Sequence, residues 1–271
     1  YNALLATGAV AALVAAFLAW YRRSRLPPLR TPRTGHGGSV GRTEITVAFF
    51  HPYCHAGGGG ERVLWQGLRA LVDEGSPNPD VDVRFVVYTG DVGVSAEDIL
   101  DRVEKRFGIT FPSVDSVKFV YLHKRSLIEA ASYPRFTMLG QSVGSMVLAW
   151  EAISALRPDV FVDTTGCAFT YPVAWFARCR VACYTHYPTI TTDMLTRVAS
   201  RRPSYNNADD VSGSALRTYA KLAYYHAFAA AYRWAGRFVD TVMVNSTWTQ
   251  GHIAALWRRG GGGAGGGGGG G

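Results

Sequence analysis

Cysteine is scarce in this chain, and the shortage narrows what the protein can be. Four cysteines occur among 271 residues, far below the density of a small secreted scaffold that disulfide bonds hold together. They suit a reducing compartment, and they stand at Cys54, Cys167, Cys179 and Cys183. The sequence therefore argues against a disulfide-rich extracellular module.

Lysine is also rare, although the chain is basic. The net charge is +8, and 4 of the 28 basic residues are lysine, so 28 − 4 = 24 are arginine. A basic protein can bind nucleic acid, but no RNA- or DNA-binding motif accompanies the arginines, and we expect no nucleic-acid partner. Attraction to anionic lipid headgroups and to pyrophosphate substrates explains the charge as well.

Standard catalytic and metal-binding motifs are missing. The sequence has no nucleophile elbow and no Ser–His–Asp order. Histidines and cysteines fall into two groups with the spacings H-x2-C-H and C-x3-C-x2-H, which match no standard zinc pattern. We therefore expect no metal at these residues, which are His51, Cys54, His55, Cys179, Cys183 and His186.

What the chain does have is a run of four glycines after an apolar segment. Residues 45–50 (ITVAFF) predict a buried strand. Beyond the glycines, Val63, Leu64, Leu68 and Leu71 recur on one face of a predicted helix. A glycine loop before a helix N-terminus presents backbone N–H groups and a positive dipole end to an anion. The candidate phosphate-binding residues are Gly57, Gly58, Gly59, Gly60 and Arg62.

Two familiar phosphate motifs do not fit this loop. A P-loop needs Gly-Lys-Ser/Thr, but Glu61 and Arg62 follow Gly60. The dinucleotide fingerprint needs a third glycine where Arg62 or Val63 stands. A flexible surface turn is therefore the alternative, and a capping role is favoured for Glu61.

Strand and helix patterns alternate from residue 45 onward. This alternation, with nearly continuous apolar strands, predicts an α/β fold with a Rossmann-like parallel sheet and helices on both faces. Ligands of such sheets bind beyond the carboxyl ends of the strands. The expected strands are 45–50, 81–88, 117–121, 159–163, 179–184 and 239–244, and the expected helices are 60–74, 95–107, 141–156, 168–177, 213–235 and 247–257.

The two ends of the chain differ from the middle in composition. Residues 3–20 carry no charge, and Arg22, Arg23 and Arg25 follow at once. This pattern predicts a transmembrane anchor over 1–21 with the remainder on the cytosolic side, and the alternative is an alanine-rich helix that only lies on the membrane. Residues 22–43 are a basic linker, and the glycine tail 260–271 is expected to be disordered.

Residues 213–237 combine aromatic and basic side chains, among them Arg217, Lys221, Arg233 and Arg237. Such a composition suits a helix that lies in a lipid headgroup layer. A core helix of the domain is an equally good interpretation.

Five blocks carry a resemblance to a known family. They read HPYCHAGGGGERVLW (51–65), FTMLGQSVGSMVLAWE (136–151), PDVFVDTTGCAFTYP (158–172), YTHYPTITTDML (184–195) and VMVNSTWTQGHI (242–253). Together they resemble the GDP-mannose-dependent α-1,2-mannosyltransferases of asparagine-linked glycosylation, over about residues 44–257.

The resemblance implies a fold and an activity. Residues 44–259 would be the N-terminal, acceptor-side domain of a two-domain retaining glycosyltransferase of the GT-B type, which we expect to continue into a donor-binding domain. The expected substrates are GDP-mannose and a dolichol-diphosphate-linked oligosaccharide, and no cofactor is needed. The expected location is the endoplasmic reticulum membrane, single-pass with the catalytic domain cytosolic, among other glycosyltransferases of the same pathway.

Four more candidate site residues follow from the family-like blocks. His186 and Asp163 are the catalytic candidates. By resemblance, His186 would contact the donor mannose near the reacting carbon, and Asp163 would position an acceptor hydroxyl. Thr165 and Asp193 are further acceptor-side candidates. His186 has a structural alternative as a histidine bonded within its loop, and Asp163 and Asp193 have one as aspartates that serve a turn or a cap.

Two other functions compete with this interpretation. One is a different GT-B glycosyltransferase with another acceptor. The other is a non-catalytic, membrane-bound module that holds lipid-linked sugar or a partner enzyme.

Overall fold

The computed structural model describes residues 43–190 and 215–257. The predicted anchor (1–21), nearly all of the linker (22–43), Asp193 and the glycine tail (260–271) lie outside the described residues. The described residues form two compact units. The first unit contains residues 43–184 and 239–243, and the second contains 185–190, 215–238 and 244–257.

Six strands form one sheet in the order β3-β2-β1-β4-β5-β6. The β1–β2, β1–β4, β2–β3 and β4–β5 pairs are all parallel. This is the strand order of Rossmann-type folds, so the predicted parallel α/β fold is confirmed. The strands are β1 (Thr43–Phe50), β2 (Val81–Thr89), β3 (Lys118–Tyr121), β4 (Val160–Asp163), β5 (Arg180–Thr185) and β6 (Thr241–Val244).

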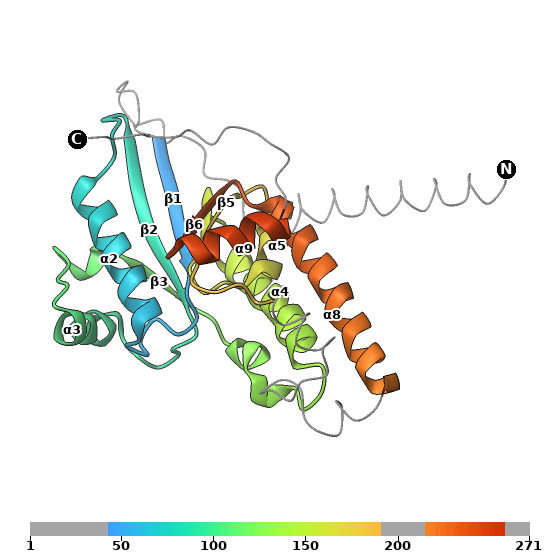
Figure 1. Ribbon diagram of the computed structural model, residues 1–271. Helices are drawn as coiled ribbons and strands as arrows, with labels where there is room; N and C mark the ends of the chain where they lie inside the picture. The colour runs from blue at the N-terminus through green and yellow to red at the C-terminus, as the bar shows by residue number, and fades with distance from the viewer. Residues whose placement is uncertain (1–42, 191–214, 258–271) are drawn as a thin grey trace, which may run out of the picture. The chain divides into compact units, whose positions relative to one another are not determined.

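Helices α2 (Gly59–Glu74) and α3 (Ala96–Phe107) cover one face of the sheet in the first unit (Figure 1). Side chains alternate along a strand, and those that point to this face form one buried cluster with the two helices. From the sheet the cluster includes Phe49, Phe85, Val87 and Val162, and from the helices it includes Leu64, Trp65, Leu68, Ile99 and Val103.

Helix α4 (Thr137–Ala155) covers the opposite face. Here Phe50, Tyr88 and Phe161 of three neighbouring strands pack their rings together, with centroids 5.6 and 6.3 Å from that of Phe161. Leu148 and Ile153 of α4 are fully buried. Both faces of the sheet are therefore covered, as expected for apolar parallel strands. The short helix α5 (Tyr171–Phe176) follows β4.

Two glycines let α4 approach a segment that the sequence patterns did not predict, the short 3-10 turns within residues 125–132. A Cβ atom on Gly144 would lie 1.8 Å from the backbone oxygen of Leu127, and one on Gly140 would lie 2.3 Å from the ring of Tyr133. Such distances are impossible for a side chain, so these two positions require glycine. The predicted start of this helix, residue 141, is four residues late because Gly140 reads as a helix breaker.

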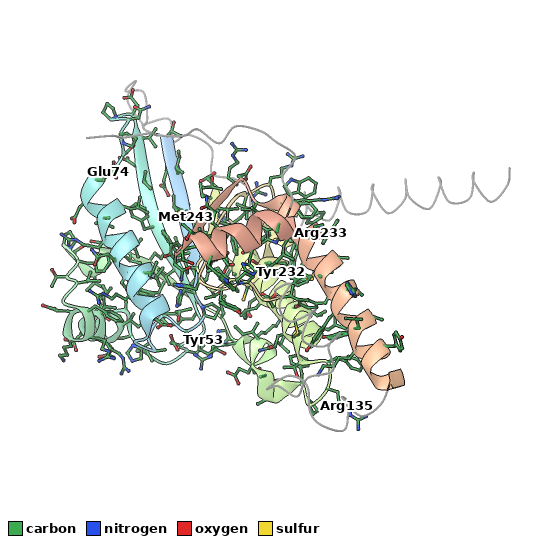
Figure 2. The ribbon with its side chains drawn as sticks, in the orientation of Figure 1. Tyr53, Glu74, Arg135, Tyr232, Arg233 and Met243 are labelled. Carbon is green, nitrogen blue, oxygen red and sulfur yellow. The ribbon has the colours of Figure 1, made fainter. Side chains whose placement is uncertain are left out.

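In the second unit, helix α8 (Ala215–Ala235) packs on α9 (Thr247–Trp257). Tyr232 and Arg233 are labelled on α8 in Figure 2. The rings of Tyr232 and Trp257 lie 5.5 Å apart, and Arg233 Nε donates to the carbonyl of Leu256 at 2.9 Å. This packing supports the core interpretation for one face of α8, whereas Tyr219 and Trp234 are exposed. Within the described residues, no helix is long and apolar enough to cross a bilayer.

The glycine contact of α4 can be tested against a matched glycine of α2. We expect Gly144→Ala to lower the free energy of unfolding by about 2 kcal/mol or more, because the backbone of Leu127 must move. Gly67, where an added Cβ atom would meet nothing within 4 Å, is the control: Gly67→Ala should raise stability by about 1 kcal/mol through helix propensity. Urea unfolding followed by circular dichroism measures both. Equal effects of the two substitutions would contradict the close contact.

Candidate functional site

The carboxyl ends of β1 and β4 meet at the point where the strand order reverses. In the register, Phe50 lies beside Asp163, and Thr164 N–H donates to the carbonyl of Phe50 at 3.4 Å. In open α/β sheets the ligand crevice lies beyond the strands at this switch point. The residues that follow Phe50 and Asp163 are therefore the first candidates for a site.

His51 joins three segments at this point. Its side chain is 2% exposed, with Nδ1 2.8 Å from Thr164 Oγ1 and Nε2 3.2 Å from Glu61 Oε1. A carboxylate only accepts hydrogen bonds. In the neutral imidazole, Nε2 therefore carries the proton that goes to Glu61, and Nδ1 accepts from the threonine hydroxyl. His51 connects the ends of β1 and β4 to the start of α2.

Glu61 caps the N-terminus of α2. Its Oε2 accepts the N–H of Gly58 at 2.6 Å, so the carboxylate lies at the positive end of the helix dipole. The hydrogen bond from His51 is the main reason that the pKa of Glu61 is lowered, and backbone hydrogen bonds add to the effect. The capping role expected for Glu61 is thus what the geometry shows. The role of His51 was missed, because its partner Thr164 is 113 residues away.

The glycine loop is open to solvent, and two arginines of α3 hydrogen-bond to carbonyl groups at its start. Gly57 has φ +85°, a conformation that favours glycine. Arg106 Nε donates to the Gly57 carbonyl at 3.2 Å, and Arg102 donates to the Ala56 carbonyl at 3.4 Å. Gly58 and Gly59 are exposed, so the backbone is accessible to a ligand.

Arginines surround this loop. Arg62 is exposed in the first turn of α2, and Arg102 and Arg106 reach the loop from α3. The sequence indicated only Arg62. Arg102 and Arg106 share a helix face, since they are four residues apart, but only the packing of α3 beside α2 brings them to the loop.

Asp163, by contrast, has no contact with solvent. It is 0% exposed, and Tyr171 Oη, Thr165 Oγ1 and Thr165 N–H donate to its carboxylate at 2.8, 2.8 and 2.9 Å. Burial raises the pKa of this carboxyl group. An acceptor hydroxyl would have to displace one of these donors to touch Asp163. The geometry gives Asp163 a positioning role, in which it orients Thr165 and the β4–α5 loop.

His186 belongs to the second unit. It follows β5, and its backbone carbonyl lies 3.3 Å from Thr249 Oγ1 of α9. Thr249 is 1% exposed and also lies 2.9 Å from Asn245 Oδ1. The loop that carries His186 is therefore anchored on the first turn of α9.

Two of the side chains considered for a metal, His51 and Cys54, have hydrogen-bond partners of their own. His51 bonds to Thr164 and Glu61, and Cys54 Sγ donates to Thr89 Oγ1 at 3.2 Å. Burial raises the pKa of the Cys54 and Cys179 thiols to about 12, so both are protonated at neutral pH. Across 43–190 and 215–257, no three potential ligand side chains are grouped for a metal.

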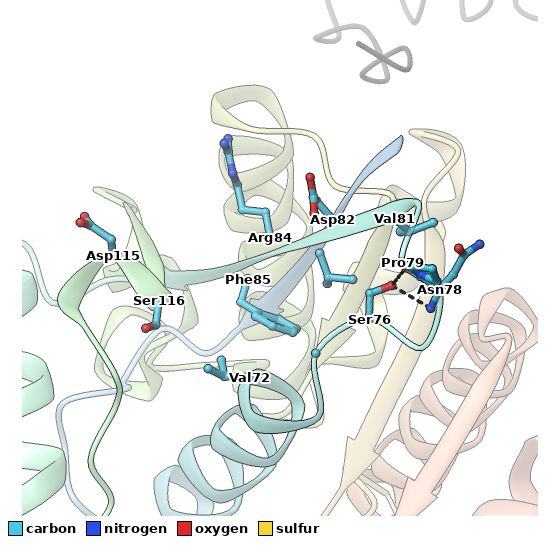
Figure 3. A pocket seen from close by; sticks show the side chains of 12 residues that line it. Val72, Ser76, Asn78, Pro79, Val81, Asp82, Arg84, Phe85, Asp115 and Ser116 are labelled. Atoms are coloured by element: carbon cyan, nitrogen blue, oxygen red, sulfur yellow. Dashed lines mark hydrogen bonds between the residues drawn. The ribbon is translucent and has the colours of Figure 1, made fainter. Parts of the chain in front are cut away.

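An open hollow lies near the amino-terminal end of β2, away from the carboxyl ends of the strands (Figure 3). It is lined by the amino-terminal part of β2, including Asp82 and Arg84, by the turn that contains Ser76 and Asn78, and by Asp115. Ligands of parallel sheets bind at the carboxyl ends, so we assign no function to this hollow.

Comparisons with a family model and with individual proteins point to the same family. Residues 44–257 match the family model described as ALG11 mannosyltransferase N-terminus. The chain is 50% identical over 221 residues to a protein of Mus musculus, 49% over 222 residues to one of Xenopus tropicalis, and 47% over 221 residues to one of Homo sapiens. All three are named GDP-Man:Man(3)GlcNAc(2)-PP-Dol alpha-1,2-mannosyltransferase. These matches cover 81–82% of this chain and 44% of each relative.

The helix cap predicts a pH-dependent stability. Because the pKa of Glu61 is lowered in the folded state, its stabilising effect is complete above the usual carboxyl pKa of about 4.3 and is lost as the pH falls through the lower folded value. We expect Glu61→Gln to cost about 1 kcal/mol at neutral pH and less at an acidic pH below the usual carboxyl pKa.

Urea unfolding at both pH values measures this effect. Asp73→Asn on the same helix is the control, since the exposed pair Arg69–Asp73 should contribute about 0.5 kcal/mol or less. A Glu61→Gln deficit that does not change with pH would show that the charge of the cap is unimportant.

Proposed function

The chain belongs to the ALG11 mannosyltransferase N-terminus family, and on that premise we propose that it is the acceptor-side half of an α-1,2-mannosyltransferase. The donor is GDP-mannose, and the acceptor is a dolichol-diphosphate-linked oligosaccharide. The observation that carries the proposal is the family match over residues 44–257, together with the shared name of relatives up to 50% identical. The chain spans 44% of the length of those relatives, so the activity is proposed for the whole enzyme.

The fold is consistent with the N-terminal half of a two-domain GT-B transferase. Such an enzyme builds its active site between two nucleotide-type domains, each contributing the carboxyl edge of its sheet. The six-stranded parallel sheet provides one such edge. A second domain would hold the guanosine group, for which the exposed glycine loop offers no enclosed pocket.

The glycine loop would interact with the diphosphate of the donor. Transfer breaks the bond between the mannose anomeric carbon and the diphosphate, and a bond from an acceptor hydroxyl oxygen replaces it with retained configuration. The proton of that hydroxyl leaves with the departing diphosphate or passes to solvent. Negative charge then grows on the leaving GDP. The positive end of α2, the glycine loop (Gly57, Gly58, Gly59 and Gly60) and Arg62 would stabilise that charge. The N–H groups of Gly59 and Gly60 would be the backbone donors, because the Gly58 N–H already donates to Glu61. Arg102 and Arg106 would hold the loop in place.

The remaining candidates act around the acceptor and the sugar. His186 is proposed to contact the donor mannose, as the resemblance implies. Thr165 is proposed to face the acceptor, with Asp163 behind it as a positioning residue. Asp193 is proposed on the acceptor side by resemblance alone, because it lies outside the described residues.

We also propose a location for the enzyme. The uncharged run at residues 3–20 and the arginines after it favour a single-pass anchor in the endoplasmic reticulum membrane with the catalytic part cytosolic. Other glycosyltransferases of the pathway would be neighbours on that membrane.

Transfer activity can be tested in a chimera, in which residues 44–257 replace the matching residues of the Xenopus tropicalis relative. We expect the chimera to move radiolabelled mannose from GDP-mannose to dolichol-linked Man(3)GlcNAc(2). Gly59→Val should then lower kcat/KM about tenfold or more, because a branched side chain would keep the phosphate from the backbone.

Gly67→Val is the matched control in the same helix, since neither Gly59 nor Gly67 has any atom within 4 Å of a Cβ position. Full activity of the Gly59→Val chimera would mean that the loop is a surface turn. A chimera that folds but transfers nothing would count against the proposed function.

Membrane orientation can be tested at Asn245. Asn245-Ser246-Thr247 is a glycosylation sequon, and Asn245 is exposed, so a luminal enzyme would present it for modification. We expect no mass shift on endoglycosidase treatment of the protein expressed in eukaryotic cells. A glycan that disappears in the Asn245→Gln variant would reverse the proposed orientation.

A further inference from the structure

Residues 185–190, which carry His186, alternate between buried and exposed positions. Thr185 and Ile190 are 1% and 0% exposed and Pro188 is buried, whereas Tyr187 is 60% exposed. The buried residues fix the loop on both sides of Tyr187. A large aromatic ring is therefore held at the surface, next in sequence to His186.

The ring of Tyr187 is stacked on an aromatic residue of α9. Its centroid lies 5.1 Å from that of Trp248, with 22° between the ring planes. Trp248, which is 42% exposed, in turn lies 3.9 Å from the ring of His252. One face of Tyr187 rests on Trp248, and the exposed fraction of Tyr187 leaves its other face open. Stacking orients the ring without hiding it.

Polar but neutral groups border this aromatic stack. Asn245 and Ser246 are exposed at the start of α9, and Thr249 links them to the carbonyl of His186. Residues 185–190 and 245–252 contain no Asp, Glu, Lys or Arg. Within these two described segments, no acidic or basic side chain is available to attract a phosphate or an anionic lipid headgroup.

An open aromatic face with neutral hydrogen-bonding groups at its rim fits a sugar ring. A pyranose has an apolar face of C–H groups, which packs on an aromatic ring, and an edge of hydroxyl groups, which bond to amides and hydroxyls. An aliphatic chain would leave the polar rim unused, so the features favour a ligand that combines a stacking face with hydrogen-bonding groups.

We propose that Tyr187, supported by Trp248, is a stacking platform for a neutral pyranose ring of the acceptor glycan. This proposal rests on the proposed function, which makes the chain the acceptor-side half. It assigns the sugar a position next to His186 and adds an acceptor-binding residue to the candidates.

Saturation-transfer difference NMR tests the platform on the chain of 271 residues itself, with the free Man(3)GlcNAc(2) glycan as the probe. We expect sugar C–H protons to receive saturation from the wild-type protein. Tyr187→Ala should reduce that transfer about fivefold or more, and Tyr187→Phe should keep most of it, because the ring and not the hydroxyl makes the contact.

The control is Tyr219→Ala on α8, which removes a tyrosine of similar exposure, 68%. It should leave the signal unchanged. Near-ultraviolet circular dichroism checks that each variant is folded. No transfer to the glycan with the wild-type chain, or equal transfer with Tyr187→Ala, would overturn the proposal.

A second arm with GDP-mannose distinguishes the two possible sources of the sugar. The acceptor assignment would be overturned if the mannose protons of GDP-mannose, and not those of the glycan, received saturation that depends on Tyr187. The platform would then belong to the donor. Binding and transfer are separate readouts. A glycan signal that depends on Tyr187 would support the platform even if the chimera transferred no mannose. If the wild-type chain gave no glycan signal, the platform would be refuted even with an active chimera.

Discussion

The parallel pairing of β1 with β4, completed by His51, is the constraint on which the candidate site depends. The pairing brings together two strand ends that are separated by more than a hundred residues in the chain. His51 then uses both ring nitrogens, one toward Thr164 after β4 and the other toward Glu61 in α2. Both partners are buried or nearly so, with Glu61 at 13% side-chain exposure, and a buried polar group that loses its partner costs about 1–3 kcal/mol. The position of the glycine loop therefore follows from a core interaction.

Glu61 gives the loop its electrostatic character. A carboxylate at the first turn of α2 uses the N–H of Gly58 and offsets part of the helix dipole. Arg62 in the same turn, and Arg102 and Arg106 from α3, add positive charge on the solvent side. The formal charge of these four side chains is positive in sum, and the donors left for an anion are the backbone of Gly59 and Gly60 and the guanidinium groups. The N-terminal cap of α2 is therefore satisfied by Glu61 whether or not an anion is bound.

Helix α4 shows a different use of glycine. Gly140 and Gly144 are required by close contacts with Tyr133 and Leu127, whereas Gly57 is required by its backbone conformation and Gly59 has open space. The same residue type thus serves packing, a turn and accessibility at three places. At Gly59, as at Gly67, the fold itself leaves room for a side chain, so the proposed reason for a glycine at Gly59 is the approach of a phosphate to the backbone.

Within the described residues, sequence patterns alone predicted the fold class, the six strands and the six α-helices to within a few residues, because apolar periodicity records which side of each element faces the core. They also located the glycine loop, the cap at Glu61 and the family-like blocks. Tertiary structure alone decided the partners of His51, the approach of Arg102 and Arg106 to the loop, the burial of Asp163, and the stacking of Tyr187 on Trp248. Each of these joins residues far apart in the chain or depends on the direction of a side chain. Periodicity says that a residue is inside or outside, but strand pairing and helix packing determine which distant residue it meets.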